Sequence, residues 1–195
     1  MKRRDALKNL GLAVGYTAII PSAFSILQSC QSEKKLWTPL FFSNEEGIVI
    51  ENLVDIILPK TKKIPGALDV NVPEFIDLYA SKVYVGEDLE AYRLGIASIM
   101  EELPIPDTGA KDLKTEHYEA LLSKYLRANK EQRKQYELDE HVTYMALANL
   151  RGQAVWAFKT SEEIGENVLA YDPIPGVQKG CISLEEATGG KDWSL

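Results

Sequence analysis

The sequence contains very little cysteine and histidine. Its 195 residues include two of each, and no Cys-x-x-Cys pair occurs. Two cysteines cannot form a disulfide scaffold or a structural zinc site built from cysteine alone. Two histidines leave few side chains for a metal centre or for acid–base chemistry near neutral pH. The composition therefore weighs against a self-contained enzyme.

Cofactor and nucleic-acid signatures are also missing. There is no Gly-x-Gly-x-x-Gly stretch, no phosphate-binding loop, no haem attachment motif and no Gly-x-Ser-x-Gly. The formal net charge is −7, whereas a nucleic-acid binder needs a basic surface to displace counterions from phosphates. We expect no catalytic residue, no metal site and no cofactor in this chain, and no nucleic-acid partner.

The N-terminus has the pattern of an export signal. Arg3 and Arg4 precede an apolar stretch over residues 10–27, as in signal segments. Together with Leu7 and Lys8, the two arginines resemble a twin-arginine motif, which directs folded proteins across a membrane. Folded export of a chain without cofactor motifs indicates that this chain carries a passenger protein.

The leader ends in a sequence that resembles a bacterial lipobox. Leu-Gln-Ser precedes Cys30, the residue that would be lipidated and become the mature N-terminus. We therefore predict a lipoprotein signal over residues 1–29 and a periplasmic, lipid-anchored protein. A tether over residues 30–42 follows, polar over residues 31–35 and apolar over residues 36–42, where it should pack on the domain. The alternative is an uncleaved anchor helix, which needs roughly 20 apolar residues. Residues 10–27 fall just short of that length.

Helical periodicity predicts an all-α domain over residues 43–169, a small bundle of about five helices. Ser43 and Glu46 have the spacing of a capping box, and Pro59 ends the apolar stripe that follows. Residues 129–136 are highly charged and fit either a turn or an exposed helix start. The expected helices run over about 43–58, 73–85, 88–103, 115–128 and 138–159.

The last part of the chain, residues 170–195, is predicted to be an irregular arm because proline and glycine interrupt it repeatedly. Its aromatic residues Tyr171 and Trp193 must pack on the domain or on a partner to avoid exposure. If Cys30 is lipidated, Cys181 is the one remaining thiol. An odd cysteine in an exported protein indicates a disulfide to another chain or a free thiol; the ordinary alternative is a small buried residue.

Glu137 and His141 are four residues apart on the last predicted helix, a spacing that can place two ligands on one face. A catalytic zinc site needs a third protein ligand, and His117 lies on a different predicted helix. We interpret both histidines as structural.

Several segments, taken in order, resemble the gluconate 2-dehydrogenase subunit 3 family. The arm matches most specifically, through Tyr-Asp-Pro-Ile-Pro-Gly at residues 171–176 and the Gly-Cys pair at 180–181. The remaining matching segments are residues 53–59, 61–67, 72–77, 158–165 and 189–193.

The resemblance implies a non-catalytic small subunit that binds, matures and co-exports a large subunit. That partner would be an FAD-dependent dehydrogenase of the glucose–methanol–choline type, acting on sugars or sugar acids and passing electrons to a cytochrome c. Besides the export machinery, the partner interface or inter-chain disulfide would involve Tyr171, Pro175, Gly176, Cys181 and Trp193. The alternative from a different class is a stand-alone envelope lipoprotein that binds a ligand or another partner.

Overall fold

The computed structural model describes residues 37–174, 176 and 180–194. All helices described below belong to the compact unit Thr38–Leu195. The predicted signal and the polar part of the tether, residues 31–35, lie outside the described residues and remain predictions. The site residues outside the described ones are Arg3, Arg4, Leu7, Lys8, Cys30 and Pro175.

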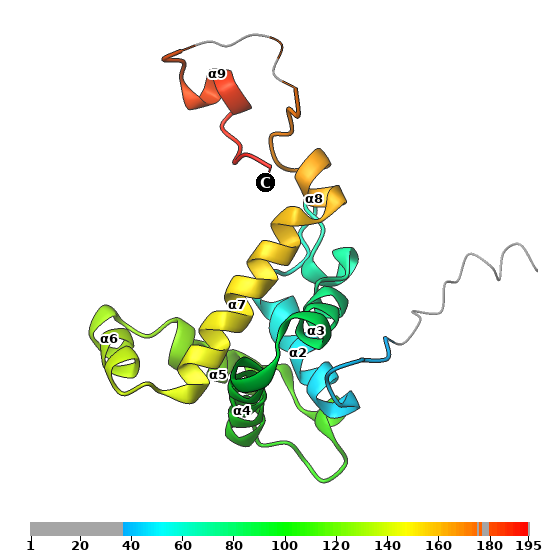
Figure 1. Cartoon of the computed structure of the whole chain (residues 1–195), viewed down its shortest axis with the longest axis vertical. Helices are drawn as coiled ribbons and strands as arrows, with labels where there is room; N and C mark the ends of the chain where they lie inside the picture. The colour runs from blue at the N-terminus through cyan, green and yellow to red at the C-terminus, as the bar shows by residue number, and fades with distance from the viewer. Residues whose placement is uncertain (1–36, 175, 177–179, 195) are drawn as a thin grey trace, which may run out of the picture. The chain divides into compact units, whose positions relative to one another are not determined.

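The described residues form an all-α fold, which confirms the predicted class (Figure 1). They contain no β-strand, only an isolated bridge between Ala170 and Trp193. Eight α-helices are present among them: five correspond to the expected helices, and three are additional short helices. The α-helices are α2 (Asn44–Ile57), α3 (Val72–Val83), α4 (Gly86–Glu102), α5 (Thr115–Leu126), α6 (Lys130–Leu138), α7 (Val142–Thr160), α8 (Glu162–Asn167) and α9 (Leu184–Thr188), with 3₁₀ turns η1 (Ala67–Val70) and η2 (Ala110–Asp112).

Local hydrogen bonds explain where the first long helix begins. The backbone N–H of Glu46 donates to the Ser43 hydroxyl over 3.2 Å, and the Ser43 N–H donates to the Glu46 carboxylate over 2.7 Å. This is the predicted capping box, which satisfies backbone donors that lack partners within the helix. Asn129 and Gln132 form the same arrangement at the start of α6.

The prediction of one helix over residues 138–159 is wrong at its N-terminal end. Residues 130–138 form the separate helix α6, and α7 begins only at Val142 with His141 as its N-cap. Between them, Glu140 adopts a left-handed backbone conformation with φ of 48°, which breaks the helix. Of the two expectations for residues 129–136, the exposed helix start is confirmed, because Asn129 caps α6 and no residue of α6 is buried.

Helix α7 is the longest helix and lies at the centre of the bundle (Figure 1). It contacts α2, α3, α4, α5 and α8, and α4 is its most extensive neighbour. Its buried face includes Leu147, Leu150 and Ala154. In the described part of the chain, no helix is both long and apolar enough to cross a bilayer.

The segment that leads into α2 is held by a buried carboxylate. Asp77 on α3 is almost fully buried and accepts backbone N–H bonds from Leu40, Phe41 and Phe42 over 2.7, 2.9 and 3.0 Å. The guanidinium of Arg93 also lies 4.2 Å from the centre of the Phe41 ring. Because the three N–H groups supply the hydrogen bonds that a buried carboxylate requires, Asp77 fixes the entry into the bundle.

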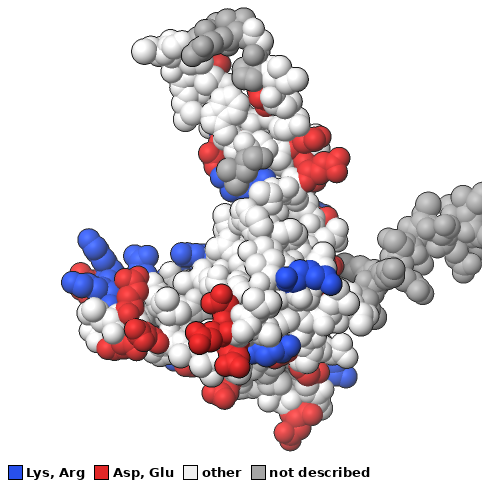
Figure 2. All heavy atoms as spheres, viewed as in Figure 1, with Lys and Arg blue, Asp and Glu red and all other residues white. Residues whose placement is uncertain are grey.

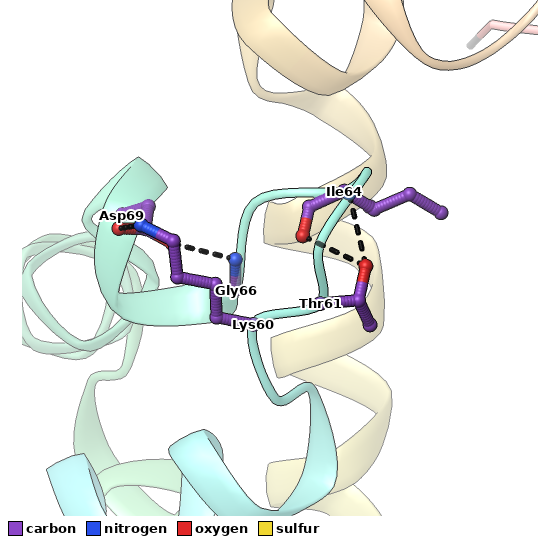
Figure 3. Close-up of polar contacts among 5 residues, drawn as sticks. All are labelled: Lys60, Thr61, Ile64, Gly66 and Asp69. Carbon is purple, nitrogen blue, oxygen red and sulfur yellow. Dashed lines mark hydrogen bonds and ion pairs between the residues drawn. The ribbon is translucent and has the colours of Figure 1, made fainter.

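The loop between α2 and η1 is closed by polar contacts (Figure 3). The Ile64 N–H donates to the Thr61 hydroxyl over 2.9 Å, and the Lys60 ammonium lies 2.8 Å from the Asp69 carboxylate. The Gly66 N–H donates to the other Asp69 oxygen over 2.8 Å. A Cβ at Gly66 would lie 2.6 Å from the Lys60 backbone nitrogen, so this close approach requires glycine.

The arm folds back onto the C-terminal end of the bundle and is less irregular than predicted. The Ala170 N–H donates to the Asp192 carbonyl, and the Ser194 N–H donates to the Ala170 carbonyl, both over 2.9 Å. The Lys159 ammonium on α7 pairs with the Asp192 carboxylate. Within the arm, α9 is a helix that sequence periodicity missed; Ser183 caps its N-terminus and Gly189 ends it in a left-handed conformation.

Candidate functional site

A large apolar surface remains uncovered on α3, α4 and α7. Figure 2 shows few charged side chains over the length of α7 in this view. On α7, the apolar side chains of Val142, Met145, Val155 and Trp156 are all exposed. The exposed large apolar side chains on the three helices are Phe75, Leu78, Val83, Leu94, Val142, Met145, Val155 and Trp156.

An open groove of about 620 Å³ runs between α4 and α7 within this surface. At its base the two helices approach closely, because a Cβ added at Gly95 would lie only 3.0 Å from the Ala146 Cβ. Leu94 and Met145 stand at its edges and are 60% and 52% exposed. The groove is lined by Tyr84, Asp88, Ala91, Tyr92, Leu94, Gly95, Ile96, Glu140, Val142, Met145, Ala146, Ala148, Asn149 and Leu150.

Two stacked tyrosines form a rigid wall of the groove. The rings of Tyr84 and Tyr92 lie 4.5 Å apart, centre to centre. The Tyr92 hydroxyl donates to the Gln153 amide oxygen over 3.1 Å, and the Gln153 amide nitrogen donates to the Tyr84 hydroxyl over 2.8 Å. Burial, and then the neighbouring Tyr84, raise the pKa of Tyr92 far above the ordinary tyrosine value. Both hydroxyls therefore support the wall through Gln153, and the Tyr92 hydroxyl stays protonated at physiological pH.

The only charged residues that line the groove are acidic. Asp88, in the first turn of α4, and Glu140, in the break between α6 and α7, are both exposed. Neither carboxylate has an ion pair or hydrogen bond to any other described residue. The groove thus presents an apolar floor with two carboxylates available to a cation from outside.

The predicted arm residues lie at the surface. Tyr171 and Trp193 are about half exposed although their backbones lie at the closure of the arm. Cys181 is a free, exposed thiol rather than a buried residue, and Gly176 is exposed. These positions permit contact with another chain; the predicted interface and disulfide stay predictions.

Glu137 and His141 do not share a helical face, because the helix breaks between them. Glu137 accepts a hydrogen bond from the Tyr144 hydroxyl over 3.2 Å. The His141 ring packs against Tyr125 and Tyr136, with centroid distances of 5.1 and 5.3 Å. Within the described residues, no group of three histidine, cysteine or acidic side chains is arranged to hold a metal ion.

Sequence reasoning missed the groove. Periodicity marks Val142 and Met145 as apolar, but it cannot distinguish a stripe covered by the chain itself from one left open. One sequence signal could have indicated it. Apolar residues lie on nearly every side of α7, so helices packed on one side of it cannot cover all of them.

Fold and surface together define an all-α domain with an open apolar groove. The family model for gluconate 2-dehydrogenase subunit 3 matches residues 44–176. This match spans more than half of the chain, so the protein belongs to the gluconate 2-dehydrogenase subunit 3 family, and the predicted resemblance is confirmed. The designation as a third subunit implies a complex with other subunits. No curated protein and no solved structure matches the chain.

Proposed function

We propose that this chain is a non-catalytic small subunit that binds, matures and co-exports a flavoprotein dehydrogenase. The partner is a large subunit of the glucose–methanol–choline type that holds FAD and oxidises a sugar or sugar acid. The single observation that carries the proposal is the open apolar groove between α4 and α7 in a member of a subunit family. An uncovered surface of this kind supports a partner rather than a reaction as the function of the groove.

The proposal assigns export to the leader. Arg3 and Arg4 engage the twin-arginine machinery for both chains, after the flavoprotein has folded around its FAD in the cytoplasm. Cys30 then carries the lipid that holds the complex to a membrane on the periplasmic side. Electrons pass from the flavoprotein to a cytochrome c, and Cys181 forms a disulfide with the partner once the compartment is oxidising.

Co-expression with a candidate flavoprotein large subunit of the glucose–methanol–choline type tests the carrier role. Flavin fluorescence and immunoblotting of the large subunit are measured in periplasmic and cytoplasmic fractions. We expect the Arg3→Lys, Arg4→Lys double variant to leave the flavoprotein in the cytoplasm. The conservative Lys2→Arg variant, which changes the leader outside the motif, should export normally. Export by the double variant at the level of the unmodified chain would refute the carrier role.

Two further measurements test the anchor and the disulfide. A Cys30→Ser variant should lose metabolic labelling with palmitate and release the complex from the membrane fraction. Non-reducing electrophoresis of the exported complex should show a covalent pair that disappears in Cys181→Ser. If the chain is exported but remains monomeric and free of flavoprotein, it acts instead as a stand-alone lipoprotein.

A further inference from the structure

We propose that the α4–α7 groove receives one amphipathic α-helix of the flavoprotein large subunit. The helix would present an apolar stripe to the groove and basic side chains toward both of its ends, one to Asp88 in the first turn of α4 and one to Glu140 just before α7. This inference rests on the proposed function, since it names the surface and the chemistry by which that partner is bound.

The shape of the groove favours a macromolecule over a small ligand. Small-molecule sites bury most of the ligand and use a few polar groups to orient it. Here Leu94 and Met145 leave the edges open, and the hydroxyls of Tyr84 and Tyr92 are already engaged with Gln153. A helix satisfies its backbone hydrogen bonds internally. It can therefore bind to an open floor that offers few polar groups.

The floor also fits the approach of a helix. Gly95 on α4 lies against Ala146 on α7, Ala91 also lines the groove, and these small residues keep its base low. Helices pack with axes about 8–10 Å apart when small side chains lie at the contact. A third helix can therefore lie along the two, with apolar anchors at i, i+3, i+4 and i+7 between the side chains of Leu94 and Met145.

Charge complementarity specifies the partner further. The lining offers two carboxylates and no cation, so a basic side chain on the incoming helix would meet unpaired acidic groups. Helix α6 of a second copy fits poorly, because it carries Lys130, Arg133 and Lys134 but has no buried residue.

Binding of the purified full-length chain to the purified, FAD-loaded large subunit tests the docking. Leu94→Asp and Met145→Asp should each raise the dissociation constant at least about 30-fold, since each loses the burial of an apolar side chain and places a carboxylate in the groove. The matched control Ile64→Asp, an exposed apolar residue on the loop after α2, should stay within about threefold. Thermal unfolding of each variant establishes that it is folded.

A second pair of variants tests the charge argument. Asp88→Lys and Glu140→Lys should each weaken binding by about three- to tenfold at 50 mM salt and make affinity less salt-dependent. A photo-cross-linking residue at position 94 should link to a large-subunit helix that carries a lysine or arginine.

The outcomes separate the docking site from the proposed function. If the unmodified chain binds the flavoprotein and Leu94→Asp binds equally well, the groove is not the docking site while the carrier function stands. If the unmodified chain does not bind the flavoprotein at all, both the function and the docking fail. If sedimentation of the chain alone shows a dimer that Leu94→Asp abolishes, the groove belongs to a second copy and the helix proposal is wrong.

Discussion

Replacing Asp77 by asparagine should loosen the segment that leads into α2. In the native protein one Asp77 oxygen accepts the N–H groups of Phe41 and Phe42, and the other accepts that of Leu40. Asparagine keeps one acceptor oxygen and places an NH₂ group where the second oxygen was. The bonds to Phe41 and Phe42 can survive, whereas the Leu40 N–H would face a donor.

The size of the effect follows from that difference. A hydrogen bond to a charged group contributes about 1.5–3 kcal/mol. The variant loses one such bond and weakens two others from charged to neutral, so we expect unfolding to cost about 2–4 kcal/mol less. The loss has an upper limit, because residues 38–42 can detach and hydrate their backbone while the rest of the bundle stays folded. Detachment would also expose Phe42, which is buried in the native protein.

Urea denaturation gives the change in unfolding free energy, and amide hydrogen exchange at single residues gives its location. The Leu40 amide should lose protection most, followed by those of Phe41 and Phe42. The control is Asp55→Asn on the exposed face of α2, which should change stability by no more than about 0.5 kcal/mol. Unchanged Leu40 exchange in Asp77→Asn, together with unchanged stability, would refute the assignment of Asp77 as the anchor of this segment.

Three further changes probe other parts of the fold. Gly66→Ala should destabilise by about 1–3 kcal/mol in urea denaturation, because the new methyl group meets the Lys60 backbone. Hydrogen bonds, first from Lys124, hold the pKa of Glu102 below its usual range; that stabilisation is complete above about pH 4.3 and is lost as the pH falls through the lowered pKa. Glu102→Gln should therefore be less stable than the unmodified chain at pH 7 by at most about 1 kcal/mol, with the gap closing toward pH 3 in parallel denaturation curves. Lys159→Gln should speed chymotrypsin cleavage within the arm, because the arm loses its ion pair to α7.

Each of these changes has a control and a contrary outcome. Gly152→Ala, on an exposed helical position with open space around it, should stabilise by about 0.5–1 kcal/mol, the opposite sign from Gly66→Ala. A pH-independent gap for Glu102→Gln would show that its carboxylate is not the titrating group. Cleavage of Lys159→Gln at the native rate would show that the backbone bonds of Ala170 alone hold the arm.

The parts of the fold that could be predicted from sequence are those with strong local signals. The helix expected over residues 115–128 is α5, and its apolar residues Tyr118, Leu121, Leu122 and Tyr125 recur at helical spacing and are all buried. The capping box at Ser43 is likewise decided within four residues, so no distant contact can override it.

The break before α7 could not be predicted in this way. Neither proline nor glycine marks it, and Glu140 adopts a left-handed conformation that side chains other than glycine, asparagine and aspartate rarely take. The aromatic contacts of Tyr136 with Tyr125 and His141 hold α6 against the bundle across this turn. Helix α9 escaped prediction because five residues are too few to establish a period.

Helix α7 accounts both for the missed groove and for the proposed function. Its apolar residues occupy nearly its whole circumference: Leu147 and Leu150 face the core, while Val142, Met145 and Trp156 face outward. A helix that is hydrophobic all round is normally buried on every side. In this chain α3, α4 and α5 cover only part of it, and the remainder is the groove and its flanks. The composition of α7 is that of an interior helix in a larger assembly, which supports a second subunit as the missing cover and makes Leu94→Asp the decisive substitution.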